Sequence, residues 1–327
     1  MSELLATIDI GTNTALLLIS AREENGLKEI FNAAEFVRLG EGMDASGTVG
    51  DAALSRLRSA LSSHMSHIRR FSVTNVIVTG TSASRDASDA YRIKEMVLEI
   101  TGTDLWILSG EEEAHTTFLG AVSGINTFEC SPRPTSYDDL ITVIDVGGGS
   151  TEIVQGNPIS GDILFKKSLN MGSVRMTERF FTGQPVSSVE IGRAQQAFTT
   201  MMEEELTHHQ RTSVCVGASG TAVLLGLIRQ SVSGSGPALD SDASEEVAHR
   251  RPITLPKLQA QSNSLLGMTR SEVLSLEPLK MKGREDVFPA GVFILSLTVE
   301  YLLSSTLLIS PFGVRHGVAL REFARSH

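Results

Sequence analysis

Two glycine turns carry the residue types best suited to binding phosphate. Asp9 precedes the first turn, Gly11-Thr12-Asn13, and Asp145 precedes the second, Gly147-Gly148-Gly149-Ser150-Thr151. Consecutive backbone N–H groups in such turns form an anion-binding concavity, and glycine lets a ligand approach the main chain. An aspartate at a strand end supplies the kind of carboxylate that Mg²⁺ takes together with phosphate oxygens. The pattern therefore predicts a phosphate-binding turn at both places. Plain hairpins with a turn-forming glycine are the alternative.

The two turns also form an internal repeat. The segments Thr7–Ser20 and Val143–Gly156 both read as an apolar strand, an aspartate, a glycine turn and a second apolar strand, with the two aspartates 136 residues apart. Copies at that distance indicate two domains of similar plan. Two unrelated hairpins would give the same pattern, so the spacing alone does not decide.

A third glycine turn, Gly217–Thr221, lies between an expected strand and an expected helix. Amides at a helix N-terminus bind anions, which makes Gly217, Ser219 and Gly220 candidate phosphate ligands. A simple close approach of the helix to the strand explains the same glycines equally well.

Carboxylates that could serve as a general base occur at two places. Glu111, Glu112 and Glu113 begin an expected helix. Because consecutive helical residues lie about 100° apart, only one or two of them can face a given site. One of them could remove a proton from water, or all three could simply favour the positive end of the helix dipole. Glu152, directly after the second turn, is another candidate, and spacing does not rank the four.

Arg85 lies in a junction of small residues, 80–87, between a strand and a helix. A guanidinium there can bind phosphate through two parallel hydrogen bonds, or it can pair with Asp86 or Asp89. The sequence has neither the Gly-x4-Gly-Lys-[Ser/Thr] pattern of P-loops nor a His-Asp dipeptide. These absences argue against a Walker-type loop and against a His/Asp metal-phosphohydrolase centre.

Apolar strands alternate with helices along the chain, which predicts an α/β fold. The expected helices include 52–68, 88–100, 111–122, 187–208 and 287–303. The expected strands include 76–78, 105–108, 163–170, 213–216 and 306–310. Segment 126–139, with two prolines, and segment 231–249, rich in Ser, Gly, Asp and Glu, are expected to be irregular.

Composition narrows the classes of function. The 327 residues are 41% hydrophobic, enough for packed cores, and carry a net charge of −10. Because nucleic acids and membrane surfaces attract cationic proteins, we expect neither as a partner. The two cysteines fit a reducing cytoplasm, and no targeting segment is evident. The apolar stretch 287–309 contains Pro289, Gly291 and Glu300, which favours a buried helix and strand over a membrane span.

The order of these motifs resembles that of the Ppx/GppA phosphatases, the exopolyphosphatases and guanosine pentaphosphate phosphohydrolases of the actin/Hsp70/sugar-kinase superfamily. The matching segments are Ile8–Asn13, Arg38–Gly42, Gly80–Arg85, Ser109–Ala114, Ile144–Glu152, Met171–Arg175, Gly217–Thr221, Gly283–Asp286 with Pro289–Gly291, and Gly313–Val318. The resemblance is to the short form without the helical His-Asp-type domain of longer members. His316 is a departure, because a glutamate is commoner at that position.

The resemblance implies two RNase-H-like domains of the actin-like type, with an active-site cleft between them. The domains would be 1–122 completed by 313–327, and 123–312. The resemblance also implies Glu113 as the general base, Arg85 as a phosphate contact, and Asp145, Asp9 and Glu152 as the residues that hold water and Mg²⁺ or Mn²⁺. No organic cofactor is expected, and a homodimer is compatible with the family.

The expected function is release of orthophosphate from the end of inorganic polyphosphate. The alternative substrate is guanosine pentaphosphate, pppGpp. An actin-fold kinase and a non-catalytic sensor of polyphosphate or an alarmone are more distant alternatives. The adenosine-binding elements of the kinases are not recognisable, and the candidate catalytic residues Glu113, Asp145 and Glu152 are all present.

Overall fold

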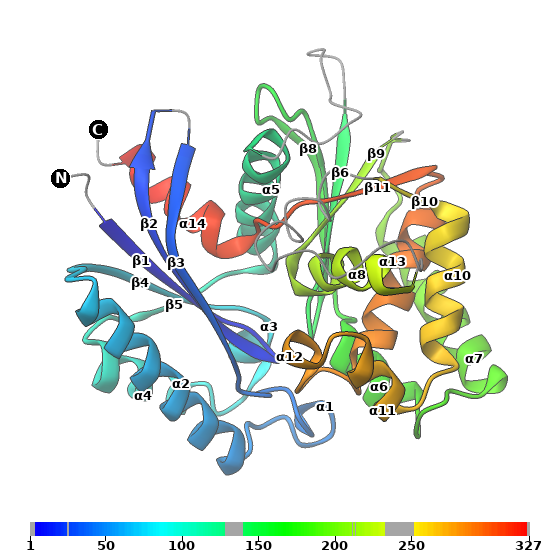
Figure 1. The fold of residues 1–327 in the computed structure, drawn as a ribbon, viewed down its shortest axis with the longest axis horizontal. Helices are drawn as coiled ribbons and strands as arrows, with labels where there is room; N and C mark the ends of the chain where they lie inside the picture. Colours follow the sequence, from blue (N-terminus) through cyan, green and yellow to red (C-terminus); the bar gives the residue numbers. More distant parts are fainter. Residues whose placement is uncertain are drawn as a thin grey trace. The chain divides into compact units, whose positions relative to one another are not determined.

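The chain divides into two compact units (Figure 1). Unit 1 comprises Met1–Gly120 and Gly313–His327, and unit 2 comprises Ala121–Phe312. The computed structural model describes residues 4–24, 26–127, 140–210, 212, 214–232 and 252–325. Most of the two segments expected to be irregular, 126–139 and 231–249, therefore lies outside the described residues, as does Cys130.

Unit 1 is built on a five-stranded sheet of order β3-β2-β1-β4-β5. The strands are β1 (Leu4–Ile10), β2 (Thr14–Glu23), β3 (Gly26–Phe36), β4 (Asn75–Gly80) and β5 (Leu105–Ile107). β1 is antiparallel to β2 and parallel to β4, and β2 is antiparallel to β3. Its helices are α1 (Met43–Ser46), α2 (Asp51–Arg70), α3 (Ser82–Asp86), α4 (Tyr91–Thr101), the start of α5 (Gly110–Thr127) and α14 (Val314–Arg325).

Alternation along β1 gives this strand two different faces. Ile8 and Ile10 lie in the apolar core that also contains the buried side chains of α2. Because successive strand side chains point to opposite faces, Thr7 and Asp9 lie on the other face. There the Thr7 hydroxyl donates to the backbone carbonyl of Arg315 in α14, at 3.1 Å. The C-terminal helix thus covers the face of the sheet on which Asp9 lies.

Unit 2 is built on a six-stranded sheet of order β10-β11-β9-β6-β7-β8. The strands are β6 (Ile141–Val146), β7 (Thr151–Gly156), β8 (Ile163–Leu169), β9 (Val214–Ala218), β10 (Ile253–Thr254) and β11 (Thr306–Ile309). The helices are α6 (Ser173–Phe180), α7 (Ser188–Glu205), α8 (Ser219–Val232), α10 (Leu255–Leu266), α11 (Arg270–Leu276), α12 (Pro278–Met281) and α13 (Phe288–Tyr301).

The repeat seen in the sequence is a repeat of topology. Unit 1 runs β3-β2-β1-β4-β5, and unit 2 runs β8-β7-β6-β9-β11 followed by the short β10. In both units the strand after the glycine turn is antiparallel to the strand before it and to the strand that follows. The prediction of two similar α/β domains is confirmed, although the sequence did not predict β3 as part of the first copy.

The most apolar stretch of the chain is an internal element of unit 2. It forms helix α13, whose residues Phe288–Val299 are all buried, and strand β11 follows it. This confirms the expectation of a buried helix and strand. Among the described residues, no helix combines the length and hydropathy that a membrane span requires.

Within unit 1, helix α14 crosses α5 at a point where only glycine fits. A Cβ atom added to Gly317 would lie 1.8 Å from the Thr116 carbonyl oxygen, and one added to Gly120 would lie 2.2 Å from the Gly313 carbonyl oxygen. Both contacts are to backbone atoms, which cannot rotate away. The crossing therefore fixes the distance between the C-terminal helix and the helix that begins with Glu111, Glu112 and Glu113.

We expect Gly317→Ala to lower the free energy of unfolding by about 1–3 kcal/mol, because the methyl group forces helices α5 and α14 apart. Gly192→Ala in α7 is the matched control. Gly192 is exposed and has no atom within 4 Å of its added Cβ, so there alanine should stabilise by roughly 0.5–1 kcal/mol through its lower unfolded-state entropy. Denaturant titrations measure both changes; equal effects of the two substitutions would contradict the crossing.

His316 is held in one neutral tautomer. Its Nδ1 accepts a hydrogen bond from the Gly313 N–H at 3.1 Å, so Nε2 carries the proton and donates to Glu29 Oε1 at 2.8 Å. Burial lowers the pKa of His316 from its usual 6.5 to about 4. The pKa of the Glu29 carboxyl is also lowered. Its burial, which acts to raise that pKa, is outweighed by the hydrogen bond from His316 and by other contributions that include the charge of Arg315.

These pKa shifts predict that acid destabilises the fold. In the unfolded chain His316 takes up a proton below about pH 6.5, whereas in the folded chain it does so only near pH 4. Stability is therefore fully present above pH 6.5 and falls, by at most roughly 3 kcal/mol from this residue, as the pH drops to 4. In His316→Gln, which keeps a donor for Glu29 but does not titrate, this loss should be absent. Melting temperatures at pH 7 and pH 5 measure it, and equal pH dependence in both proteins would show that His316 does not contribute.

Candidate functional site

Both glycine turns close with the same hydrogen bond. The Gly11 N–H donates to the Thr14 carbonyl at 2.8 Å, and the Gly147 N–H donates to the Ser150 carbonyl at 3.0 Å. A Cβ atom added to either glycine would lie 3.2 Å from that same carbonyl oxygen. This is closer than most real Cβ contacts, so each turn favours glycine at its first position and the two turns share one geometry.

In unit 1 the segment that follows β3 binds the carbonyl groups of the turn. The Gly40 N–H donates to the Thr12 carbonyl at 2.9 Å, and the N–H groups of Val37 and Arg38 donate to the Asn13 carbonyl at 3.0 Å. Within the described part of the chain, the N–H groups of Thr12 and Asn13 have no hydrogen-bond partner. With its carbonyls bound and its amides open, the turn presents donors, as an anion site requires.

In unit 2 the segment after β8 does the same for the second turn. The Ser173 N–H donates to the Gly147 carbonyl and the Val174 N–H to the Gly148 carbonyl, each at 2.9 Å. The amides of Gly148 and Gly149 have no partner among the described residues. In both units, therefore, a later segment donates hydrogen bonds to the carbonyl groups of the glycine turn. The sequence did not predict this feature of the repeat.

The hydroxyl group of Thr151, predicted to be a phosphate ligand, is already engaged in the fold. It donates to the Met171 carbonyl at 2.6 Å and joins β7 to the end of β8. Ser150 is buried at the turn itself. The methyl group of Thr12 fills the place that a Cβ of Gly40 would take, at 2.2 Å. These side chains shape the turns, and the amides remain the candidate phosphate donors.

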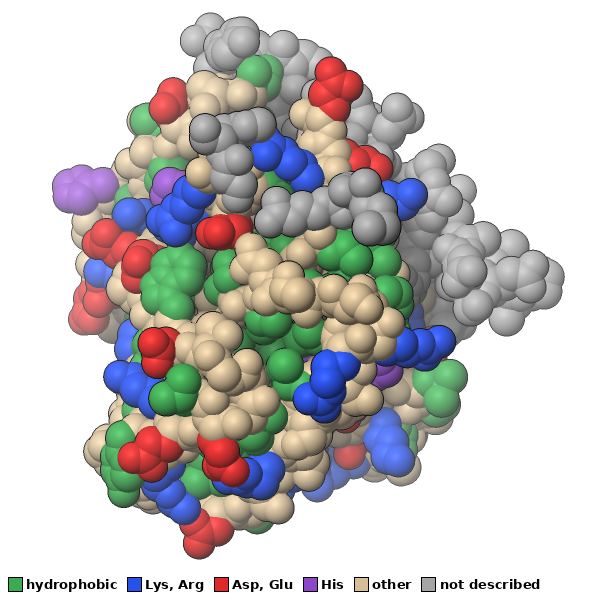
Figure 2. Space-filling model, turned by 90° about the vertical axis from the view of Figure 1, so that its left-hand side faces the viewer, with side chains coloured by type: hydrophobic (Ala, Val, Ile, Leu, Met, Phe, Trp, Pro, Cys, Tyr) green, Lys and Arg blue, Asp and Glu red, His purple; other side chains and the backbone are tan. Residues whose placement is uncertain are grey.

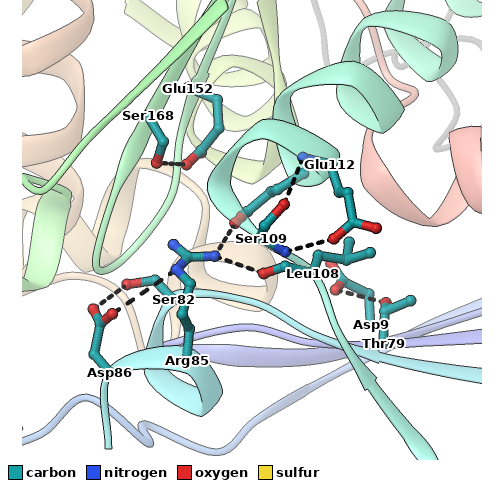
Figure 3. A network of polar contacts seen from close by, with 11 residues as sticks. Asp9, Thr79, Ser82, Arg85, Asp86, Leu108, Ser109, Glu112, Glu152 and Ser168 are labelled. Atoms are coloured by element: carbon teal, nitrogen blue, oxygen red, sulfur yellow. Dashed lines mark hydrogen bonds and ion pairs between the residues drawn. The ribbon is translucent and has the colours of Figure 1, made fainter.

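Asp145 and Glu152 are directly opposite each other on β6 and β7. Opposite residues of an antiparallel pair have Cβ atoms about 4.5–5.5 Å apart, and like charges at such positions are destabilising. Both carboxylates are buried, with 6% and 1% exposure, and Glu152 also accepts a hydrogen bond from the Ser168 hydroxyl at 2.7 Å (Figure 3). Two adjacent buried carboxylates fit a divalent cation such as Mg²⁺, which takes one or two carboxylates plus phosphate oxygens.

Asp9 has different neighbours. Its Oδ1 accepts a hydrogen bond from the Thr79 hydroxyl on β4 at 3.1 Å (Figure 3). The residue opposite Asp9 on β2 is Leu16, whereas the residue opposite Asp145 on β7 is Glu152. Unit 1 therefore supplies one carboxylate at the strand end where unit 2 supplies two. Among the described residues, no group of three or more His, Cys, Asp or Glu side chains is placed to hold a metal.

The structure separates the three glutamates at the start of α5. Glu111 is exposed. Glu112 caps the helix, because its Oε2 accepts the Ser109 N–H at 2.9 Å and its own N–H donates to the Ser109 hydroxyl at 3.2 Å (Figure 3). Glu113 is 6% exposed and faces Arg85. The capping pattern Ser109-x-x-Glu112 was present in the sequence and would have assigned Glu112 its structural role.

Arg85 is bound to Glu113 within unit 1. Its Nη1 lies 3.0 Å from Glu113 Oε2 and also donates to the Leu108 carbonyl at 2.9 Å. The two hydrogens of Nη1 are thus both engaged. Asp86, the partner expected as an alternative, lies 3.8 Å from Nε. The Nη1 group of Arg85 therefore binds Glu113, the candidate base. Only Nε and Nη2 of Arg85 remain for contact with a ligand.

The third glycine turn differs from the first two. Gly217 lies inside β9, paired on both sides, and its added Cβ would meet Ala222 at 2.8 Å. Gly217 thus allows the close approach of α8 to the strand. The sequence did not predict Arg284 as a residue of the site. Its Nη1 lies 2.8 Å from an added Cβ of Gly220 and 3.5 Å from the Gly220 carbonyl oxygen. The side chain of Ser219 lies outside the description.

The contact of Arg85 with Glu113 predicts coupled effects on turnover. Arg85→Met should lower kcat about 10–100-fold with little change in KM, because the base loses its hydrogen-bond partner. In a Glu113→Gln background the same substitution should cost almost nothing more, since the two side chains act as one unit. If Arg85 instead binds phosphate, KM rises and the two losses multiply. Arg92→Met, which removes an arginine paired with Asp89 at 3.2 Å, is the control and should leave kcat near that of the wild type.

Comparison with known proteins gives a consistent result. Residues 18–326 match the model of the Ppx/GppA phosphatase family. Exopolyphosphatase 2 of Mycobacterium tuberculosis is 29% identical over 96% of this chain and 97% of that protein. A bifunctional 3-dehydroquinate synthase/phosphatase of Fusobacterium nucleatum is 29% identical over 93% of this chain and 44% of its own length.

Solved structures match along the whole chain. A Ppx/GppA family member from Aquifex aeolicus has a TM-score of 0.77 at 23% identity, with 100% of this chain and 99% of the other covered. An exopolyphosphatase from Cytophaga hutchinsonii has a TM-score of 0.84 at 23% identity, with 99% and 98% covered. The mixed α/β fold with two sheets is thus the two-domain, actin-like fold of these proteins.

Proposed function

Because this chain belongs to the Ppx/GppA phosphatase family, we propose that it is an exopolyphosphatase that releases orthophosphate from the end of inorganic polyphosphate. Phosphatase activity is the common property of the family. The choice of polyphosphate is supported by a relative of matching length, 29% identical, that is named an exopolyphosphatase. The observation that carries the proposal is the pair of braced glycine turns with open amides, one in each unit.

The residues suggest a division of roles. The amides of Thr12, Asn13, Gly148 and Gly149 would bind non-bridging phosphate oxygens, which stabilises negative charge without reorganisation. Asp145 and Glu152 would hold Mg²⁺, which supplies further positive charge to the phosphate when bound.

Glu113 would take a proton from the attacking water. The water oxygen forms the new bond to the terminal phosphorus, the bridging P–O bond breaks, and the shortened chain leaves as the anion. Arg85 orients the carboxylate of Glu113 during this step. A buried, ion-paired carboxylate at a helix start suits a base whose position must not vary.

A long polyanion needs a continuous basic track in addition to a cleft. On the face drawn in Figure 2, Lys and Arg side chains are interspersed with Asp and Glu side chains. With a net charge of −10, this surface gives long chains little attraction beyond about 8 Å at physiological salt. We therefore propose a preference for short chains.

The free, buried thiol of Cys215 supports our proposal of a reducing, cytoplasmic location.

The test compares phosphate release from long polyphosphate, tripolyphosphate and pppGpp under equal Mg²⁺. Glu113→Gln should lower turnover about 10²–10⁴-fold while substrate binding stays nearly intact, since a general base acts in the chemical step. Glu112→Gln is the matched control and should retain most activity, because glutamine also serves as the third residue of a capping box.

Release from pppGpp alone would make the protein a pppGpp phosphohydrolase. Near wild-type turnover in Glu113→Gln would remove Glu113 from the role of base. No release from any of the three substrates would overturn the proposed activity.

A further inference from the structure

Helix α14 carries two arginines with different surroundings. The guanidinium of Arg321 lies 5.1 Å from the centre of the Trp106 ring and donates to the Thr116 hydroxyl at 3.1 Å. The Nε of Arg315 is buried and has no hydrogen-bond partner, and its guanidinium forms no ion pair with any described residue. Arg321 anchors the helix. Arg315 holds a positive charge without a contact partner among the residues that the structure describes.

The backbone of Arg315 is fixed on three sides. Its carbonyl accepts the Thr7 hydroxyl at 3.1 Å, the next residue, His316, donates to Glu29, and the glycine crossing holds the first turn of α14 against α5. The side chain therefore starts from a rigid point on the sheet face where Asp9 lies. Such rigidity lowers the entropy that a binding residue loses when its ligand arrives.

The charges near Arg315 come from two strands. Burial lowers the pKa of its guanidinium, and the carboxylates of Glu29 on β3 and Asp9 on β1 act in the opposite direction. An arginine stays protonated under such conditions. A desolvated cation without an ion pair is unfavourable, and binding of an anion relieves that cost. Arg315 remains partly exposed as a residue, so an anion can reach it from solvent.

The two units differ at this place. In unit 2 Asp145, near the end of β6, faces a second carboxylate, Glu152, on β7. In unit 1 Asp9 faces Leu16 and interacts electrostatically with Arg315. The repeat thus places two facing carboxylates in one copy, and one carboxylate with a nearby cationic side chain in the other.

From this contrast we infer that Arg315 is the phosphate-binding arginine of unit 1. Its guanidinium binds one phosphate group together with the open amides of Thr12 and Asn13, and Asp9 orients the guanidinium instead of holding the metal. The identity of the substrate rests on the proposed function, whereas the binding of a phosphate group to Arg315 does not.

The experiment measures binding of tripolyphosphate by calorimetry in a Glu113→Gln background, where turnover is suppressed. Arg315→Gln should weaken binding about 10–100-fold, the effect of losing hydrogen bonds from a charged group. Arg315→Lys should recover only part of it, because an ammonium group cannot make two parallel hydrogen bonds. Arg321→Gln, on the same helix, is the control: it should lower the melting temperature and leave the Kd unchanged.

The outcomes separate this inference from the proposed function. If wild-type protein hydrolyses tripolyphosphate but Arg315→Gln binds it as tightly as the parent, the assignment of Arg315 is wrong and the activity stands. If Arg315→Gln weakens binding but the wild-type protein hydrolyses none of the three substrates, the activity is wrong and Arg315 stands. An equal loss of binding in Arg321→Gln would show that displacement of α14 causes the effect, and would overturn the assignment.

Discussion

The site depends on where the carbonyl groups of the two glycine turns form their hydrogen bonds. A tight turn exposes amides and carbonyls alike, and exposed carbonyls repel phosphate. In unit 1 the segment Val37–Gly40 donates to the carbonyls of Thr12 and Asn13, and in unit 2 Ser173 and Val174 donate to those of Gly147 and Gly148. The third strand of each repeat delivers these donors, so its length and register decide whether the turn favours an anion.

The features that the sequence predicted are those encoded by neighbouring residues. Asp-x-Gly after an apolar run, three successive glycines, and glutamates at a helix start each express a local rule, and the structure contains both turns and the helix where they were expected. The repeat of Asp9 and Asp145 also followed from pattern alone. Of the site, local rules gave the residue types and their strand ends. They did not rank Glu111, Glu112 and Glu113, because it is burial in the folded chain that distinguishes these three. The capping pattern Ser109-x-x-Glu112, however, could have been recognised in the sequence.

The features that the sequence missed arise from contacts between distant residues. The position of Arg315 depends on Thr7, more than three hundred residues earlier in the chain. Arg284 reaches Gly220 across a separation of 64 residues. The hydroxyl of Thr151 looked like a phosphate ligand until β8 brought the Met171 carbonyl to it. Strand β3 was missed because its apolar residues do not alternate regularly with polar ones and only Leu27 is buried, which leaves a weak period-two signal.

The return of the chain to unit 1 has a consequence for how the protein is made. Strand β1, which carries Asp9, is synthesised before unit 2, whereas α14, which covers its face, is encoded after Phe312. At roughly 5–20 residues per second, about 10–40 s separate the emergence of Gly120 from that of Gly313. During that interval unit 2, a continuous segment, is synthesised in full, while the nascent unit 1 still lacks the helix that carries Arg315. Unit 1 is thus begun before unit 2 and completed after it, and the strand that carries Asp9 gains Arg315 beside it only when α14 docks.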